Sequence, residues 1–210
     1  MMHALSRVIA GICLITGPVL QGIATFYWSD RYQGIAAGTL ILVAALCWIV
    51  GLVAVFRLVE PRVPRYAAIA LPAAVYGCVG GASFGLQGLH EELFGVPHAQ
   101  AVRLLGAHPA AAYIGFWFAG LLFPISIFVL GVALTRIRAV PLPIGVLISV
   151  SAATFPLSRI PREITIAHVA DLALLVPFTY LGARIAIGNF PPFRLAVPAP
   201  PETSHARSSR

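Results

Sequence analysis

Apolar residues run along this chain in six long stretches, and short polar segments separate them. The stretches cover about 5–27, 34–56, 66–88, 111–134, 140–158 and 164–187. A helix of about 20 apolar residues crosses the ~30 Å hydrocarbon core of a bilayer. A helix also satisfies its own backbone hydrogen bonds in the bilayer, where lipid chains offer no donors or acceptors. The pattern therefore predicts an all-α polytopic bundle of six transmembrane helices, formed by residues 1–188.

The composition supports a membrane location. Of the 210 residues, 59% are hydrophobic and only 10% are charged, whereas soluble domains carry roughly 25% charged residues. The first stretch is predicted to be a retained span rather than a signal peptide, because it is longer than the usual core of about 7–15 residues and lacks a small-residue cleavage site. The lipid bilayer is the expected partner of most of the surface.

The arginines indicate how the chain is threaded. All fourteen basic residues are arginine, and ten of them fall on the side of the membrane that holds both termini. Because cytoplasmic loops are enriched in basic residues, both termini are expected in the cytoplasm of a bacterial plasma membrane. The net charge of +7 is then a topology signal beside anionic lipid, and it does not indicate a nucleic-acid partner.

Two segments lie outside the predicted spans. The connection 89–110 is expected on the outer side, with a short interfacial helix that places Ala99, Val102 and Leu105 on one face. Residues 189–210 contain five prolines and several small polar residues. They bury too little apolar area to offset the entropy of ordering, so a disordered cytoplasmic tail is expected.

Two ionisable residues interrupt the last span, in the sequence "IAHVADLALLVP". His168 and Asp171 are three residues apart and share one helix face. At 1.5 Å per residue from position 164, they lie about 6 and 10 Å along the helix, in the outer half of the bilayer. A carboxylate inside the membrane costs about 2.5–3.5 kcal/mol on insertion scales, so it normally faces the bundle interior and has a partner.

Polar residues of other spans fall at a similar depth, which leaves two interpretations open. These residues are Gln21, Thr25, Ser83, Gln87, Tyr113, Ser151 and Thr154. They could line a polar pocket that opens outward, with Gln21, Gln87, His168 and Asp171 as its binding residues. Alternatively, His168 and Asp171 bond to each other or to Gln21 and fix the packing of the helices. A protonated Asp171 without a role is the third alternative.

Three glycines in the third span suggest a close helix contact. Gly77, Gly81 and Gly85 repeat every four residues and predict one groove for another backbone. Packing within the chain is the expected use, and a homo-oligomer or a partner membrane subunit is the alternative.

Other candidate chemistry is weaker. The histidines and acids of 90–108 lack the HExxH spacing that places two imidazoles on one helix face, so no metal is predicted. The three cysteines lie in apolar stretches and indicate neither a disulfide framework nor zinc. "SRIPRE" places Arg159, Arg162 and Glu163 at the outer interface, where anchoring is expected and capture of an anionic group is the alternative.

No nucleotide-binding or hydrolase motif is present, and no cofactor is expected. The sequence therefore favours binding or transport of a small solute or lipid through an outward-facing polar pocket. A structural or regulatory membrane subunit is the alternative. A membrane-embedded enzyme that uses His168 and Asp171 as acid and base is the third and least favoured of these functions.

Three segments carry a resemblance to a known group of proteins: "SRVIAGICLITGPVL", "LFPISIFVLGVALTRIRAVPLPIGVLISV" and "ADLALLVPFTYLGARI". The most specific element is "GVALTRIRAVPLP", in which a span ends, a short basic turn follows and proline begins the next span. The chain resembles small six-span bacterial membrane proteins, common in actinobacteria, of unknown function. The resemblance implies an inner-membrane protein and brings no site residues with it.

Overall fold

The computed structural model describes residues 3–28, 33–159 and 163–190, and its regular elements are helices. They are α1 (Ala4–Thr25), α2 (Ile35–Val59), α3 (Pro64–Leu93), α4 (His98–Gly106), α5 (Pro109–Ala112), the π-helix η1 (Tyr113–Trp117), α6 (Phe118–Arg136), α7 (Leu142–Arg159) and α8 (Ile164–Ala186). Six helical segments are long and apolar enough to cross a membrane, α5, η1 and α6 forming one of them. The predicted all-α fold with six spans is confirmed. Of the tail 189–210 that is predicted to be disordered, residues 191–210 lie outside the described residues.

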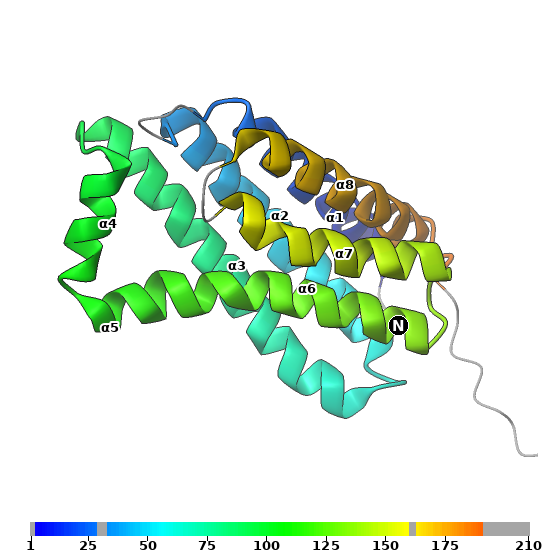
Figure 1. The fold of residues 1–210 in the computed structure, drawn as a ribbon. Coiled ribbons are helices and arrows are strands. Elements are labelled where there is room, and N and C mark those ends of the chain that lie inside the picture. The colour runs from blue at the N-terminus through cyan, green and yellow to red at the C-terminus, as the bar shows by residue number, and fades with distance from the viewer. Residues whose placement is uncertain (1–2, 29–32, 160–162, 191–210) are drawn as a thin grey trace, which may run out of the picture.

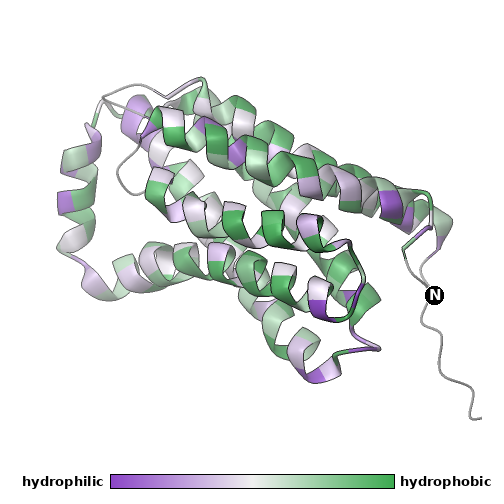
Figure 2. Cartoon of the chain, turned by 45° about the vertical axis from the view of Figure 1, so that its right-hand side comes forward, coloured by the Kyte–Doolittle hydropathy of each residue, from purple (hydrophilic) through white to green (hydrophobic). Residues whose placement is uncertain are grey.

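The six spans form a closed ring in chain order (Figure 1). Each span packs against the next, in the order α1, α2, α3, α6, α7 and α8, and α8 packs back against α1. Consecutive spans are antiparallel, and the longest connection, between α3 and α5, contains α4 (Figure 1). Apolar residues cover the spans, whereas hydrophilic residues concentrate at the helix ends and on α4 (Figure 2). We call the end where α3 stops and α5 begins the α4 end of the bundle.

The helices stop at defined backbone motifs. After α3, α6 and α8 the residues Gly95, Arg138 and Gly188 adopt positive φ angles of 66°, 54° and 73°. Each of them and the residue after it donate N–H groups to the last-turn carbonyls, which is the Schellman arrangement. Glycine suits this conformation. Arg138 adopts this positive φ in the tight turn between α6 and α7. This turn lies within "GVALTRIRAVPLP", the most specific element of the resemblance described above.

Small residues let neighbouring helices approach closely. On α1 and α8, Gly11 and Gly182 face each other, since a Cβ on either would lie within about 2.5 Å of the other's carbonyl oxygen. Gly38 of α2 and Gly85 of α3 form a similar pair. Lipid provides no hydrophobic force between helices, so such close packing contributes directly to their association.

The predicted groove on α3 is not a single groove. A Cβ on Gly77 would meet the backbone of Phe123 on α6, whereas Gly85 packs on Gly38 of α2. Gly81 lies between these two contacts, and a Cβ there would meet no atom within 4 Å. A helix inside a closed ring presents two faces to two neighbours, so a four-residue repeat of glycine is divided between them.

The glycine contacts predict opposite effects for the same substitution at two positions. Gly11→Ala places a methyl group against the α8 backbone and should lower the free energy of unfolding by about 1–3 kcal/mol, the usual cost of overpacking. Gly81→Ala enters open space and should leave stability unchanged or raise it by up to about 1 kcal/mol through helix propensity. Thermal or denaturant unfolding of the two variants in detergent measures the difference. Equal stabilities would contradict the described α1–α8 contact.

Candidate functional site: a buried ion pair beside an apolar cavity

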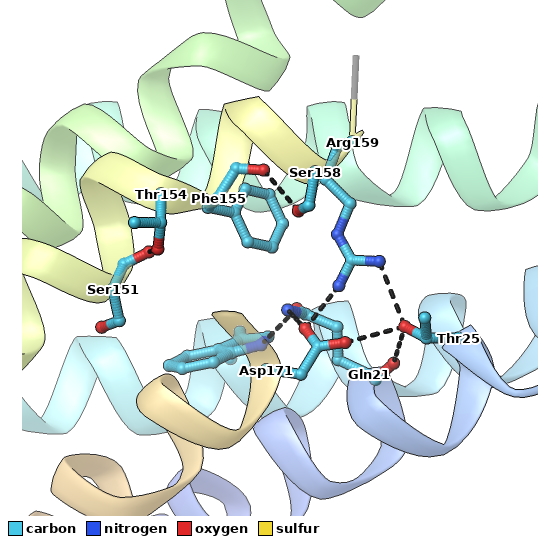
Figure 3. A network of polar contacts seen from close by, with 9 residues as sticks. Gln21, Thr25, Ser151, Thr154, Phe155, Ser158, Arg159 and Asp171 are labelled. Atoms are coloured by element: carbon cyan, nitrogen blue, oxygen red, sulfur yellow. Dashed lines mark hydrogen bonds and ion pairs between the residues drawn. The ribbon is translucent and has the colours of Figure 1, made fainter. Parts of the chain in front are cut away.

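Asp171 of α8 is the centre of a polar network inside the ring (Figure 3). Its side chain is only 4% exposed. Oδ1 accepts a hydrogen bond of 3.0 Å from Gln21 Nε2, and Oδ2 accepts one of 2.7 Å from the Thr25 hydroxyl. Both donors come from α1. The acidic residue predicted to need a partner therefore has two neutral ones on the neighbouring helix.

The charge of Asp171 is balanced by Arg159, the last residue of α7. Arg159 Nη2 pairs with Asp171 Oδ1, and Nη1 donates to the Thr25 hydroxyl oxygen at 3.1 Å. The guanidinium also lies 4.7 Å from the ring centroid of Trp28 and 4.9 Å from that of Phe155. Such cation–π contacts favour a cation that has lost part of its hydration. Arg159 thus points into the bundle, which corrects its interpretation as an interfacial anchor.

Trp48 of α2 extends the network to a fourth helix. Its indole N–H donates to Gln21 Oε1 at 3.2 Å. The ring is 2% exposed and meets Phe123 and Phe178 edge-on, with centroids 5.3 and 4.6 Å apart. These aromatic side chains fill the middle of the ring of helices, below the ion pair when the bundle is viewed from the α4 end.

A cavity of about 210 Å³ lies beside this network. Its wall is mainly aromatic and aliphatic, with polar groups at Gln21, Gln33, Gln87, His98 and Arg159. Trp28, Trp48 and Trp117 all line it, and they are the chain's three tryptophans. An apolar cavity of about 150 Å³ holds a benzene molecule, so this one has room for a substituted ring or a short alkyl chain.

A π-turn positions one of the tryptophans. Residues Tyr113–Trp117 form the π-helix η1, which adds a residue to one turn of the span. The Tyr76 hydroxyl of α3 donates to the Ile114 carbonyl oxygen at 2.6 Å and satisfies an acceptor in this irregular turn. Trp117 follows at the end of the turn and faces the cavity.

Helix α4 closes one side of the cavity. His98 Nδ1 and Glu91 Oε1 are 2.6 Å apart, and Gln87 Nε2 donates to the same oxygen at 3.1 Å. Val102 and Leu105 of α4 line the cavity. Two of the three residues of the expected apolar face, Val102 and Leu105, therefore turn towards the bundle, whereas Ala99 is exposed.

The structure separates the four predicted binding residues. Gln21 and Asp171 are hydrogen-bonded to each other, as the packing interpretation expected. Gln87 lines the same cavity as Gln21 but bonds Glu91. His168 lies against Phe26, with ring centroids 4.2 Å apart, and among the described residues no hydrogen bond joins it to Asp171.

Sequence reasoning missed the roles of Arg159 and Trp48. A carboxylate in an apolar helix requires a cation, but four arginines fall at the same end of the predicted topology, and the sequence does not choose among them. The signal that favours Arg159 is its place at the end of the preceding helix, twelve residues before Asp171. Trp48 is a lone indole in an otherwise apolar span, and its N–H requires a buried acceptor.

No cluster of three or more histidine, cysteine or acidic side chains suited to a metal ion occurs in the part of the chain that the structure describes.

In comparisons with protein-family models, curated proteins and solved structures, nothing matches this chain. The fold and its six apolar spans define a multi-pass integral membrane protein.

The ion pair predicts a non-additive pattern of stability. Asp171→Asn leaves Arg159 buried without its counter-charge and should cost about 3–5 kcal/mol of unfolding free energy. The double variant Asp171→Leu/Arg159→Met removes both charges and should be more stable than Asp171→Asn. Unfolding in detergent checks this, with the exposed Glu163→Gln as the control at the same end of the bundle. An Asp171→Asn protein as stable as the parent would contradict the pairing.

Proposed function

We propose that this protein binds a small, mainly apolar molecule that carries one hydrogen-bonding group. The observation that carries the proposal is the cavity of about 210 Å³. Its wall is apolar over most of its area, and its polar groups come from Gln21, Gln33, Gln87, His98 and Arg159. Small-molecule sites combine these features, because apolar walls supply affinity and a few polar groups fix the orientation.

Asp171 itself is absent from the cavity wall, but the polar network around it contributes to the cavity through its partners. It ties α1, α2, α7 and α8 together, and it presents two of its members, Gln21 and Arg159, to the cavity. The network therefore holds the side chains of Gln21 and Arg159 in a fixed position in the cavity wall. A preorganised site loses less entropy when the ligand binds.

Binding is favoured over passage through the bundle. Trp48, Phe123 and Phe178 pack edge-on in the middle of the ring, and Trp48 is almost fully buried. A solute that entered from the α4 end would meet this aromatic layer. The site is therefore proposed to hold its ligand, as a receptor or carrier subunit does.

The alternatives have less support. A subunit that assembles through α3 would need an unoccupied glycine face, whereas Gly77 and Gly85 pack on α6 and α2 of the same chain. An enzyme using His168 with Asp171 would need that imidazole in the cavity, whereas it lies against Phe26 and is absent from the cavity wall.

We further propose a bacterial plasma-membrane protein with both termini in the cytoplasm, which places α4 outside. Ten of the fourteen arginines support this orientation through the positive-inside bias. The ligand would then enter from the outer side or the outer leaflet.

The orientation is tested with reporter fusions in a bacterial host. Alkaline phosphatase fused after residue 210 should be inactive, and the same enzyme inserted at Gly95, in the turn before α4, should be active. The reverse pattern would contradict the proposed topology and leave the cavity unaffected.

The cavity is tested with 4-bromoacetophenone, a ring with one carbonyl and a bromine that quenches indole fluorescence. Because all three tryptophans line the cavity, quenching of protein in nanodiscs should be saturable. Gly81→Leu places a side chain in the open space at Gly81 and should raise the apparent Kd at least about ten-fold. Gly115→Leu, at a glycine that also has open space but lies outside the cavity wall, is the matched control. Non-saturable quenching that is equal in all three proteins would contradict the proposed site.

A further inference from the structure

We infer that the cavity opens sideways into the bilayer between α6 and α7, and that its ligand is a single-chain amphiphile, such as a fatty alcohol or an alkyl ketone. The polar group of this ligand lies in the cavity, and its alkyl chain remains in the membrane. The inference rests on the proposed function and specifies the chemical class of the ligand and its route of entry.

Two residues of the cavity wall are exposed at the surface of the bundle. Trp117 is 38% exposed and Leu121 is 47% exposed, whereas every other residue of the wall is buried or half-buried. Leu121 is fifteen residues from Arg136, where this span ends, which corresponds to about 22 Å along a helix axis. The hydrocarbon core is about 30 Å thick, so Leu121 faces acyl chains rather than water.

The exposed side of α6 is the side that packs on α7 nearer to their connecting turn. Leu121, Phe128 and Thr135 recur every seven residues and share one helix face. The Ser149 hydroxyl of α7 donates to the Phe128 carbonyl oxygen at 2.9 Å, and a Cβ on Gly145 of α7 would overlap the Thr135 hydroxyl. Leu121, on the same face but nearer to the α4 end, is exposed. The two helices are therefore in contact near the turn and apart at the level of the cavity.

Two features of the chain account for this opening. The span of α5, η1 and α6 has 28 residues and α7 has 18, so the longer span continues beyond the end of α7 towards the α4 end (Figure 1). Each of the two helices also contains a proline that lines the cavity, Pro124 in α6 and Pro156 in α7. A proline inside a helix removes one backbone hydrogen bond and bends the helix. Both helices thus carry a bend-inducing residue at the level where they separate.

The chemistry of the opening selects the ligand. Leu121 and Pro156 line the cavity from its two sides, and both are apolar. A charged molecule that passed between them would lose its hydration without compensation. An alkyl chain longer than the cavity is accepted, because the excess chain remains in hydrocarbon. The amide side chains of Gln33 and Gln87 in the wall both donate and accept hydrogen bonds, which suits an alcohol or a ketone.

The test measures how affinity depends on chain length, by quenching of tryptophan fluorescence in nanodiscs. The probes are 4-bromoacetophenone and 4-bromophenyl undecyl ketone, in which an undecyl chain replaces the methyl group. Their concentrations are expressed as mole fractions in the lipid, so that partitioning from water cancels. We expect the two Kd values to agree within about three-fold, because the added methylenes are in hydrocarbon before and after binding.

Other geometries of the cavity predict a large loss of affinity for the long ketone. A closed cavity has no room for the chain. In a cavity that opens only to water, each methylene moved from hydrocarbon into water weakens binding about four-fold, so saturable quenching by the long ketone disappears.

The position of the opening is tested with Leu121→Phe, which adds bulk where the chain leaves the cavity. This variant should weaken binding of the long ketone at least about five-fold and change the Kd of 4-bromoacetophenone less than about two-fold. Ile125→Phe is the matched control, because Ile125 lies one turn further along α6, is 54% exposed and is absent from the cavity wall. It should leave both Kd values unchanged.

The outcomes separate the two proposals. Saturable binding of 4-bromoacetophenone without binding of the long ketone overturns the opening into lipid and leaves the cavity as a binding site. Equal effects of Leu121→Phe and Ile125→Phe on the long ketone overturn the position of the opening between α6 and α7. Absence of saturable quenching by both probes overturns the proposed function itself.

Discussion

The arrangement of this bundle depends on the buried negative charge of Asp171, which requires a counter-charge and hydrogen-bond donors. The Asp171 carboxylate, on the second turn of α8, is 4% exposed inside the bundle, so bulk water does not solvate it. The ion pair with Arg159 and the hydrogen bonds from α1 replace that water. Since these partners come from two other helices, neutralising Asp171 also fixes how the last helix sits between its neighbours, α7 and α1.

The closed ring follows from the same limits on packing in lipid. Reciprocal glycines bring α1 onto α8 and α2 onto α3, and small residues do the same between α3 and α6. Close contacts around the circumference do not by themselves fill the centre. Trp48 fills part of it with Phe123 and Phe178, and the cavity occupies the part nearer the α4 end. The site is thus a product of the ring, because its wall draws residues from most of the helices.

The sequence was sufficient to predict the spans and the need for a buried partner at Asp171. Hydropathy depends on composition over about 20 residues, so it tolerates local error. The identity of the partner depends on the rotation of α7 and on where its last residue points. Hydropathy is insensitive to the rotation of a helix, and Arg159 was consequently assigned to the membrane interface. His168 was grouped with Asp171 by helical spacing, but a separation of three residues still leaves the two side chains about 60° apart around the helix axis, and His168 meets Phe26 instead.

The π-turn before α6 has a consequence for the phase of this span. One additional residue in a turn rotates everything before it by about 100° relative to a regular α-helix. The side chains of α5 and of the segment before it are therefore rotated about the helix axis relative to those of α6. Loss of one residue between 113 and 117 would restore an α-helix while turning α5, and with it the attachment of α4, about the axis of the span. The position of the cavity wall formed by α4 therefore depends on the number of residues in the π-turn as well as on the chemistry of the residues in that wall.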